Sequence, residues 1–189
     1  AGADESILYD AKPHIGTDAL LTVVQNLRRR ILALGGEVRF SAQATGFLRE
    51  DGALSGLEVC ERGETYTLPC RHAILAIGHS ARDTFETLLQ SGVPMEPKAF
   101  SMGVRIEHRQ SMVNESQYGA FADRLGAADY KLNVRFPDGT SAYTFCMCPG
   151  GHVVAAASEE GGVVTNGMSD FARDGENANA ALLVTLTPE

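Results

Sequence analysis

The sequence has no long apolar run and no basic stripe. Spanning a bilayer with a helix takes about 20 consecutive apolar residues, and no stretch of the 189 residues approaches that length, so we expect no membrane-spanning helix. The 16 Lys and Arg residues are outnumbered by 24 Asp and Glu residues, which gives a net charge of −8. Proteins that bind nucleic acid neutralise its phosphates with a basic surface, so nucleic acid is not an expected partner.

Secretion and metal-binding patterns are also missing. Residues 1–10 carry acidic side chains where a signal peptide has a basic segment and an apolar core. The four cysteines, at positions 60, 70, 146 and 148, do not form the dense pattern of a secreted disulfide-rich domain. No Cys or His pairs stand at zinc-finger spacing. We therefore expect a cytoplasmic protein without a metal site.

The first half of the chain predicts one helix and then antiparallel strands. Apolar residues at steps of three and four predict a helix over residues 17–34, with Thr17 as its N-cap and Gly35 at its end. Three strands should follow, with hairpin turns at residues 50–52 and at Gly63. The apolar run 73–77 is typical of a strand buried on both faces of a parallel sheet. Ser80 would then cap a second helix over residues 81–90.

After Pro94 and Pro97 the pattern becomes that of a mostly β domain. A polar loop is expected over residues 175–179, before a last strand over 182–186. The other expected elements are a short helix over 111–118 and strands over 100–108, 130–136, 140–148, 152–157 and 163–165. We therefore expect an α/β (α+β) chain with two domains, residues 1–98 and residues 99–189.

Several longer strings carry a resemblance to a known family. They read KPHIGTDAL, LAIGHSARDTFE, FSMGVRIEH, AADYKL, FCMCPGGHVVAAASEEGGVVTNGMS and RDGENANAALLVTLTPE. Together they resemble the uncharacterised FAD-dependent dehydrogenases of bacteria, and the order of elements in residues 18–80 is similar to the FAD domain of glutathione-reductase-like flavoproteins. The resemblance implies FAD as cofactor and an oxidoreductase activity. It implies a partial FAD-binding domain in residues 1–98 and a substrate-domain segment, mostly antiparallel β, in residues 99–189.

The glycine-rich phosphate loop of that family, Gly-x-Gly-x-x-Gly, has no counterpart here. Backbone amides of this loop hold the pyrophosphate at a helix N-terminus, but only Gly2 and Gly16 precede the first expected helix. The resemblance therefore implies an internal piece of an FAD-dependent oxidoreductase that is itself inactive and binds FAD weakly or not at all. Its unpaired strand edges would favour self-association. The alternative is a non-catalytic binding or structural module on a flavoprotein scaffold.

Five residues are candidate site residues. The resemblance places Ala44 on the strand whose backbone contacts adenine. Gly78, His79 and Ser80 follow the expected buried strand at its carboxyl end, where ligands gather in open α/β sheets; we interpret His79 as a structural contact rather than an acid–base group. Arg105 is a candidate clamp for an anionic substrate, because a guanidinium binds two oxygens at once. An ion pair between Arg105 and Glu107 is the alternative.

Two further groups leave alternatives open. Cys146 and Cys148 alternate on an expected strand and would share a face. A redox pair would be strained at this spacing and a zinc site lacks further ligands, so we expect buried, unreactive thiols. Lys12, His14 and Thr17 lead into the first helix. The resemblance implies a position near the flavin for them, whereas the residue types alone indicate a surface segment with an N-cap.

Overall fold

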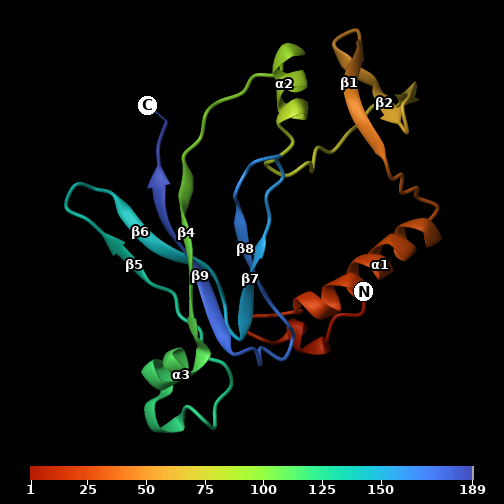
Figure 1. Cartoon of the computed structure of the whole chain (residues 1–189). Helices are drawn as coiled ribbons and strands as arrows, with labels where there is room; N and C mark the ends of the chain where they lie inside the picture. The colour runs from red at the N-terminus through yellow and green to blue at the C-terminus, as the bar shows by residue number, and fades with distance from the viewer. Residues whose placement is uncertain (189) are drawn as a thin grey trace. The chain divides into compact units, whose positions relative to one another are not determined.

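The computed structural model describes residues 1–188 and shows an α+β protein, as expected (Figure 1). The chain divides into two compact units. Unit 1 joins Ala1–Ala33 to the residues from Lys98 onward, and unit 2 is Leu34–Pro97. One junction between the units coincides with the expected domain boundary at residue 98. The N-terminal third of the expected first domain, however, packs with the second half of the chain.

Unit 2 is built on the expected three-stranded antiparallel meander. Its strands are β1 (Ala42–Glu50), β2 (Ala53–Glu61) and β3 (Glu64–Pro69), in the order β1-β2-β3. Both hairpins turn over two residues with positive φ angles, 51° and 78° at Asp51-Gly52 and 54° and 91° at Arg62-Gly63. Such mirror-image turns match the twist of paired strands. Helix α2 (Arg82–Gln90) contacts β1.

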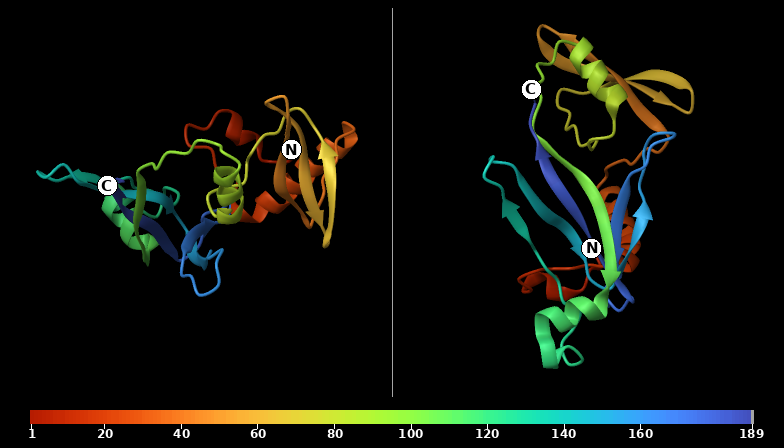
Figure 2. Two further views of the ribbon diagram at one scale, coloured as in Figure 1. Left: turned by 90° about the horizontal axis from the view of Figure 1, so that it is seen from above. Right: turned by 60° about the vertical axis from the view of Figure 1, so that its left-hand side comes forward.

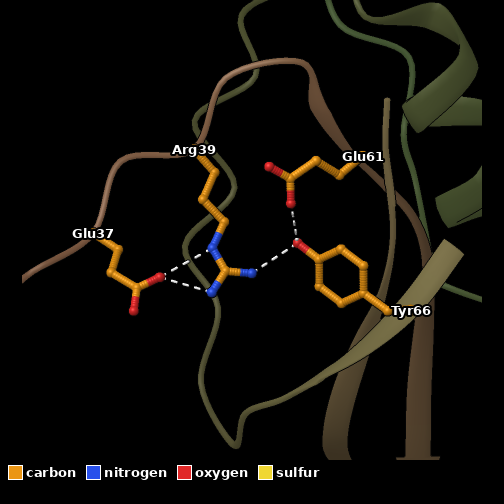
Figure 3. Close-up of polar contacts among 4 residues, drawn as sticks. All are labelled: Glu37, Arg39, Glu61 and Tyr66. Atoms are coloured by element: carbon orange, nitrogen blue, oxygen red, sulfur yellow. Dashed lines mark hydrogen bonds and ion pairs between the residues drawn. The ribbon is translucent and has the colours of Figure 1, made fainter. Parts of the chain in front are cut away.

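Hydrogen bonds of the Arg39 side chain hold the segment that precedes β1. Its guanidinium donates to the Glu37 carboxylate at 2.7 and 3.0 Å and to the Tyr66 hydroxyl at 2.7 Å, and that hydroxyl donates to Glu61 at 2.9 Å (Figure 3). These hydrogen bonds raise the pKa of Arg39, with Glu37 as the main cause. The side chains thus hold residues 37–39 beside the sheet, and Ser41, with a φ of 54°, prevents them from continuing β1.

The prediction of a buried strand over residues 73–77 is wrong. The run has no secondary structure, and Ile74 is 94% exposed. A wholly apolar strand is stable only between two neighbours in a covered sheet, and within residues 1–188 no strand pairs with it. The prediction that Ser80 caps the second helix is also wrong. Helix α2 begins one residue later than expected, and its N-cap is Ala81, which has no side-chain cap.

Unit 1 has a four-stranded antiparallel sheet and a separate hairpin, and the right-hand view of Figure 2 shows α3 at one end of the sheet. The sheet order is β4-β9-β6-β5, and the hairpin is β7-β8. The strands are β4 (Phe100–Arg109), β5 (Asn133–Arg135), β6 (Ser141–Cys148), β7 (Gly151–Ala155), β8 (Thr165–Ser169) and β9 (Asn177–Leu186). The helices are η1 (Glu5–Leu8), α1 (Thr17–Ala33), α3 (Gln110–Tyr118) and η2 (Gly119–Phe121).

A polar segment expected to be a loop and a glycine-flanked asparagine both lie in strands. Strand β9 begins at Asn177, inside the expected polar loop, and Asn179 is completely buried. Asn166 lies in β8 opposite Val154, although its glycine-rich context indicates a turn. In both places the ladder of a neighbouring strand supplies backbone partners, and this tertiary pairing overrides the turn preference of asparagine.

Small residues and one glutamine form the core of unit 1. Val113, Ala128 and Ala178 are buried together. Gln110 is buried beside them, and its amide donates to Ala128 O at 3.0 Å while its oxygen accepts from Gly150 N at 2.8 Å. This side chain therefore joins α3 to the turn that follows β6.

The helix expected over residues 17–34 is confirmed, but its apolar face is uncovered in the described chain. Val23 is buried, whereas the stripe that predicts the helix is 45–70% exposed, namely Leu20, Val24, Leu27, Ile31 and Leu34. No helix within residues 1–188 combines the length and apolar character needed to cross a membrane.

Candidate functional site

Unit 1 contains a pocket between the N-terminal segment and the ends of β6 and β8. We call it the α1 pocket, because residues at the start of α1 form one wall. Its volume is about 280 Å³. It is lined by His14, Ile15, Gly16, Thr17, Leu20, Met147, Cys148, Pro149, Gly167, Met168, Ser169 and Arg173. Three of the strings that carry the family resemblance therefore meet in one place, although more than 120 positions of sequence separate the first from the other two.

Hydrogen bonds to backbone carbonyls hold the N-terminal wall. Thr17 is the first residue of α1 and not its N-cap. Its hydroxyl donates outside the helix, to Ser169 O at 3.1 Å. The Phe171 amide donates to the Asp18 carboxylate at 2.9 Å, and this bond lowers the pKa of Asp18. Gly16, with a φ of 86°, lies so close to the Phe171 backbone that a Cβ would clash. Glycine is therefore required at this contact.

His14 is fixed in orientation and in tautomer. Its Nε2 lies 3.0 Å from Asp170 O, and its ring stacks on Phe171 with centroids 6.4 Å apart. Because a carbonyl oxygen only accepts, Nε2 must carry the proton. In the neutral ring, Nδ1 then holds the lone pair. Lys12, by contrast, forms an exposed ion pair with Asp129 at 2.8 Å and does not line the pocket.

A polar cluster lies behind the pocket at Gly167. Arg105 Nη1 donates to Asn179 Oδ1 at 2.7 Å and to Cys146 O at 3.2 Å. A Cβ at Gly167 would come within 3 Å of the Arg105–Asn179 pair and 2.8 Å from Cys148 Sγ. The absence of a side chain at Gly167 thus makes room for the cluster. Arg105 Nε and Asn179 Nδ2 are buried and have no partner in the described chain.

The surroundings of Arg105 differ from both sequence predictions, the substrate clamp and the ion pair with Glu107. Its Nη1 is engaged inside unit 1, where it donates to Asn179 and to the Cys146 carbonyl. The Glu107 carboxylate accepts instead from Asn177 Nδ2 at 3.0 Å. The alternative of an ion pair between Arg105 and Glu107 is thus not seen, and the substrate clamp stays a prediction.

The cysteine pair does not share one face of a regular strand. The register of β6 against β9 shifts between Phe145 and Cys148, and Cys146 has a φ of 46°. This bulge leaves Cys146 exposed, whereas Cys148 is half-buried in the pocket wall. Burial raises the pKa of the Cys148 thiol, although the nearby Arg105 opposes the rise. The expectation of two buried thiols is wrong because a bulge turns one side chain outward.

Arg173 is a cation of the pocket that the sequence interpretation missed. Its Nε is buried without a partner, and its guanidinium makes no hydrogen bond or ion pair within residues 1–188. Its φ is 53°, and its carbonyl packs against Gly150. The string RDGENANAALLV contains both Arg173 and Asn179 and was the signal that could have found them.

The candidate cofactor residues Ala44, Gly78, His79 and Ser80 all lie in unit 2. Ala44 is on β1, an edge strand whose outer side is unpaired in the described chain, and residues 78–80 are exposed. Gln43 Nε2 donates to Asp83 at 2.5 Å, so the segment beside Ala44 is joined to the segment that follows Ser80.

The backbone at Gly78 borders open space. Gly78 has a φ of 71°, and no atom lies within 4 Å of the place of a Cβ. The open space admits a ligand, but no described residue closes a phosphate cradle around it. Within residues 1–188, no three His, Cys, Asp or Glu side chains gather as a metal site requires.

Comparison with known proteins points to flavoproteins. Residues 99–189 match the family model "FAD-dependent protein, C-terminal domain-like". The matched segment contains three of the four segments that line the α1 pocket. The whole chain is also 50% identical, over 192 residues, to an uncharacterised protein of Clostridium beijerinckii. The alignment covers 100% of this chain and 35% of that protein, so the chain spans about a third of the length of this relative.

Proposed function

We propose that the chain is part of an FAD-dependent oxidoreductase, a dehydrogenase, in which unit 1 supplies the pocket that receives the substrate. The observation that carries the proposal is the match of residues 99–189 to the FAD-dependent family, together with the α1 pocket that this segment shares with His14 and Thr17. Bound FAD supplies hydride chemistry.

The residues of this chain would bind and orient the two reactants. The β1 backbone at Ala44 and the exposed segment at Gly78, His79 and Ser80 would contact the cofactor. In the α1 pocket, Leu20, Met147 and Met168 would exclude water from the substrate. His14 Nδ1, left with the lone pair because Nε2 donates to the Asp170 carbonyl, would be the pocket atom that accepts a proton.

The test of the cofactor is a comparison of two proteins. The longer protein that contains this sequence should purify with a flavin absorption band, and heat should release FAD from it. The 189-residue chain should bind FAD weakly or not at all and be inactive, because few contacts bear the cost of immobilising a large ligand. A longer protein that stays colourless after reconstitution with FAD would refute the proposal.

Anaerobic reduction separates the enzyme from a non-catalytic flavoprotein module. Mixing the FAD-loaded longer protein with NADH or NADPH should bleach the flavin band, and reoxidation by an acceptor should restore it. No reduction with any donor would favour the module. The four free cysteines are consistent with a cytoplasmic location, which we also propose.

A further inference from the structure

The turn fixes the backbone of Arg173, whereas its side-chain Nε has no partner in the described chain. Its amide donates to Asp170 O at 3.1 Å, and its carbonyl packs against Gly150, whose own carbonyl accepts from Gly175 N at 3.1 Å. The turn therefore fixes a non-glycine residue at a φ of 53°. Backbone in this sparsely populated region persists only where its surroundings determine it, and it concentrates at ligand sites.

The α1 pocket holds a permanent cation in a chain that is negative overall. Its lining includes Arg173 but no Asp or Glu residue, although the chain carries a net charge of −8. The Asp18 carboxylate, beside Gly16 of the lining, accepts from the Phe171 amide. Leaving a buried guanidinium N–H without an acceptor costs free energy. Arg173 lines the pocket, and an anionic ligand oxygen there would pair with its guanidinium best, because charge-assisted hydrogen bonds are the strongest.

We propose that the α1 pocket binds a small carboxylate, with Arg173 as its anchor. This inference rests on the proposed function only in that the carboxylate would be the substrate. The volume of about 280 Å³ is about twice the 150 Å³ cavity that holds a benzene ring. The apolar walls at Leu20, Met147 and Met168 suit a ring or a branched chain. The ligand class is therefore an aromatic or branched aliphatic carboxylate of on the order of ten non-hydrogen atoms.

Benzoate and benzamide form a matched pair of probes, since they have the same shape and differ in charge. Each is titrated into the ¹⁵N-labelled 189-residue chain, and the amide signals of Cys148 and Gly167 and the Nε–H signal of Arg173 are followed by NMR. Benzoate should shift these signals to saturation. Benzamide should bind at least ~10-fold more weakly, because it lacks the charge that strengthens the contact.

Variants locate the anion. Arg173→Gln should weaken benzoate binding ~10-fold or more, and Arg173→Lys, which keeps the charge but loses the planar fork, should weaken it less. Arg135→Gln is the matched control, because Arg135 is exposed on β5 and does not line the pocket. It should bind benzoate like the unmodified chain.

The outcomes separate the possible ligands. Equal binding of benzoate and benzamide to the unmodified chain would overturn the proposal, whether or not the variants fold. Unchanged benzoate binding by a folded Arg173→Gln chain would overturn it too. Tighter binding of inorganic phosphate than of benzoate at the same signals would reject the carboxylate in favour of a phosphate group. No flavin enters the experiment, so its result is independent of the FAD test.

Discussion

Replacing Gly167 by alanine tests the polar cluster behind the α1 pocket. The backbone of Gly167 has no positive φ, so alanine is allowed there by its conformation. The new methyl carbon would nevertheless lie less than 3 Å from atoms of Arg105, Asn179 and Cys148. Non-bonded atoms do not approach a Cβ that closely. The substitution must therefore push β8 outward or break the 2.7 Å hydrogen bond between Arg105 and Asn179.

The expected loss of stability follows from that hydrogen bond. A hydrogen bond to a charged group contributes about 1.5–3 kcal/mol. Replacing glycine by alanine gives back about 0.4–1 kcal/mol, because the unfolded chain loses freedom. The net loss is therefore about 0.5–2.6 kcal/mol. At roughly 2–4 °C per kcal/mol for a chain of this size, Tm should fall by about 1–10 °C.

Gly126→Ala provides the matched control for a thermal melt followed by circular dichroism. Gly126 also lacks a positive φ, and no atom lies within 4 Å of its Cβ position. It should leave Tm unchanged or raise it slightly. If Gly167→Ala melts at the same temperature as Gly126→Ala, the cluster is not packed against Gly167 and the reasoning fails.

Three further substitutions or measurements test other parts of unit 1. Gln110→Met keeps the size but leaves the partners of a buried amide unpaired, so urea unfolding should show a loss of about 2–4 kcal/mol; a loss under 0.5 kcal/mol would contradict the core described. The hydrogen bond from Phe171 lowers the pKa of Asp18 below its usual 3.8. Its stabilisation is thus complete above that value and lost as pH falls through the lower folded pKa. Asp18→Asn should therefore flatten the fall of Tm below about pH 4. Iodoacetamide should label exposed Cys146 before Cys148, whose burial raises the thiol pKa; equal labelling of the two cysteines, measured by peptide mass spectrometry after short exposure, would show that the bulge is absent.

Local chemistry allowed the sequence to predict much of the fold. The hairpins at Asp51-Gly52 and Arg62-Gly63 follow from turn residues between alternating strands. The strand at residues 100–109 and the helix that starts at Thr17 follow from apolar periodicity. In each case the signal lies within about 20 residues of sequence, where preference and pattern agree.

The errors of prediction arise where a distant partner decides. The apolar run at residues 73–77 forms no strand because no described strand lies beside it. Asn179 is buried because Arg105, 74 positions away, donates to it. The bulge at Cys146 changes the direction of one side chain without any change in the residue pattern. Arg173 was missed because its string carries the family resemblance without singling out one residue, whereas the fold places Arg173 in the pocket lining.

The two units differ in how much order a ligand must impose on them. In the α1 pocket, His14 and Thr17 are already bound to the carbonyls of Asp170 and Ser169, so a ligand of Arg173 meets a formed site. In unit 2, residues 71–80 are exposed and have no regular secondary structure. Fixing the backbone of such a segment costs about 1–2 kcal/mol per residue, and a cofactor that contacts Gly78 must supply it. The 189-residue chain should therefore bind a small carboxylate even where it fails to hold FAD.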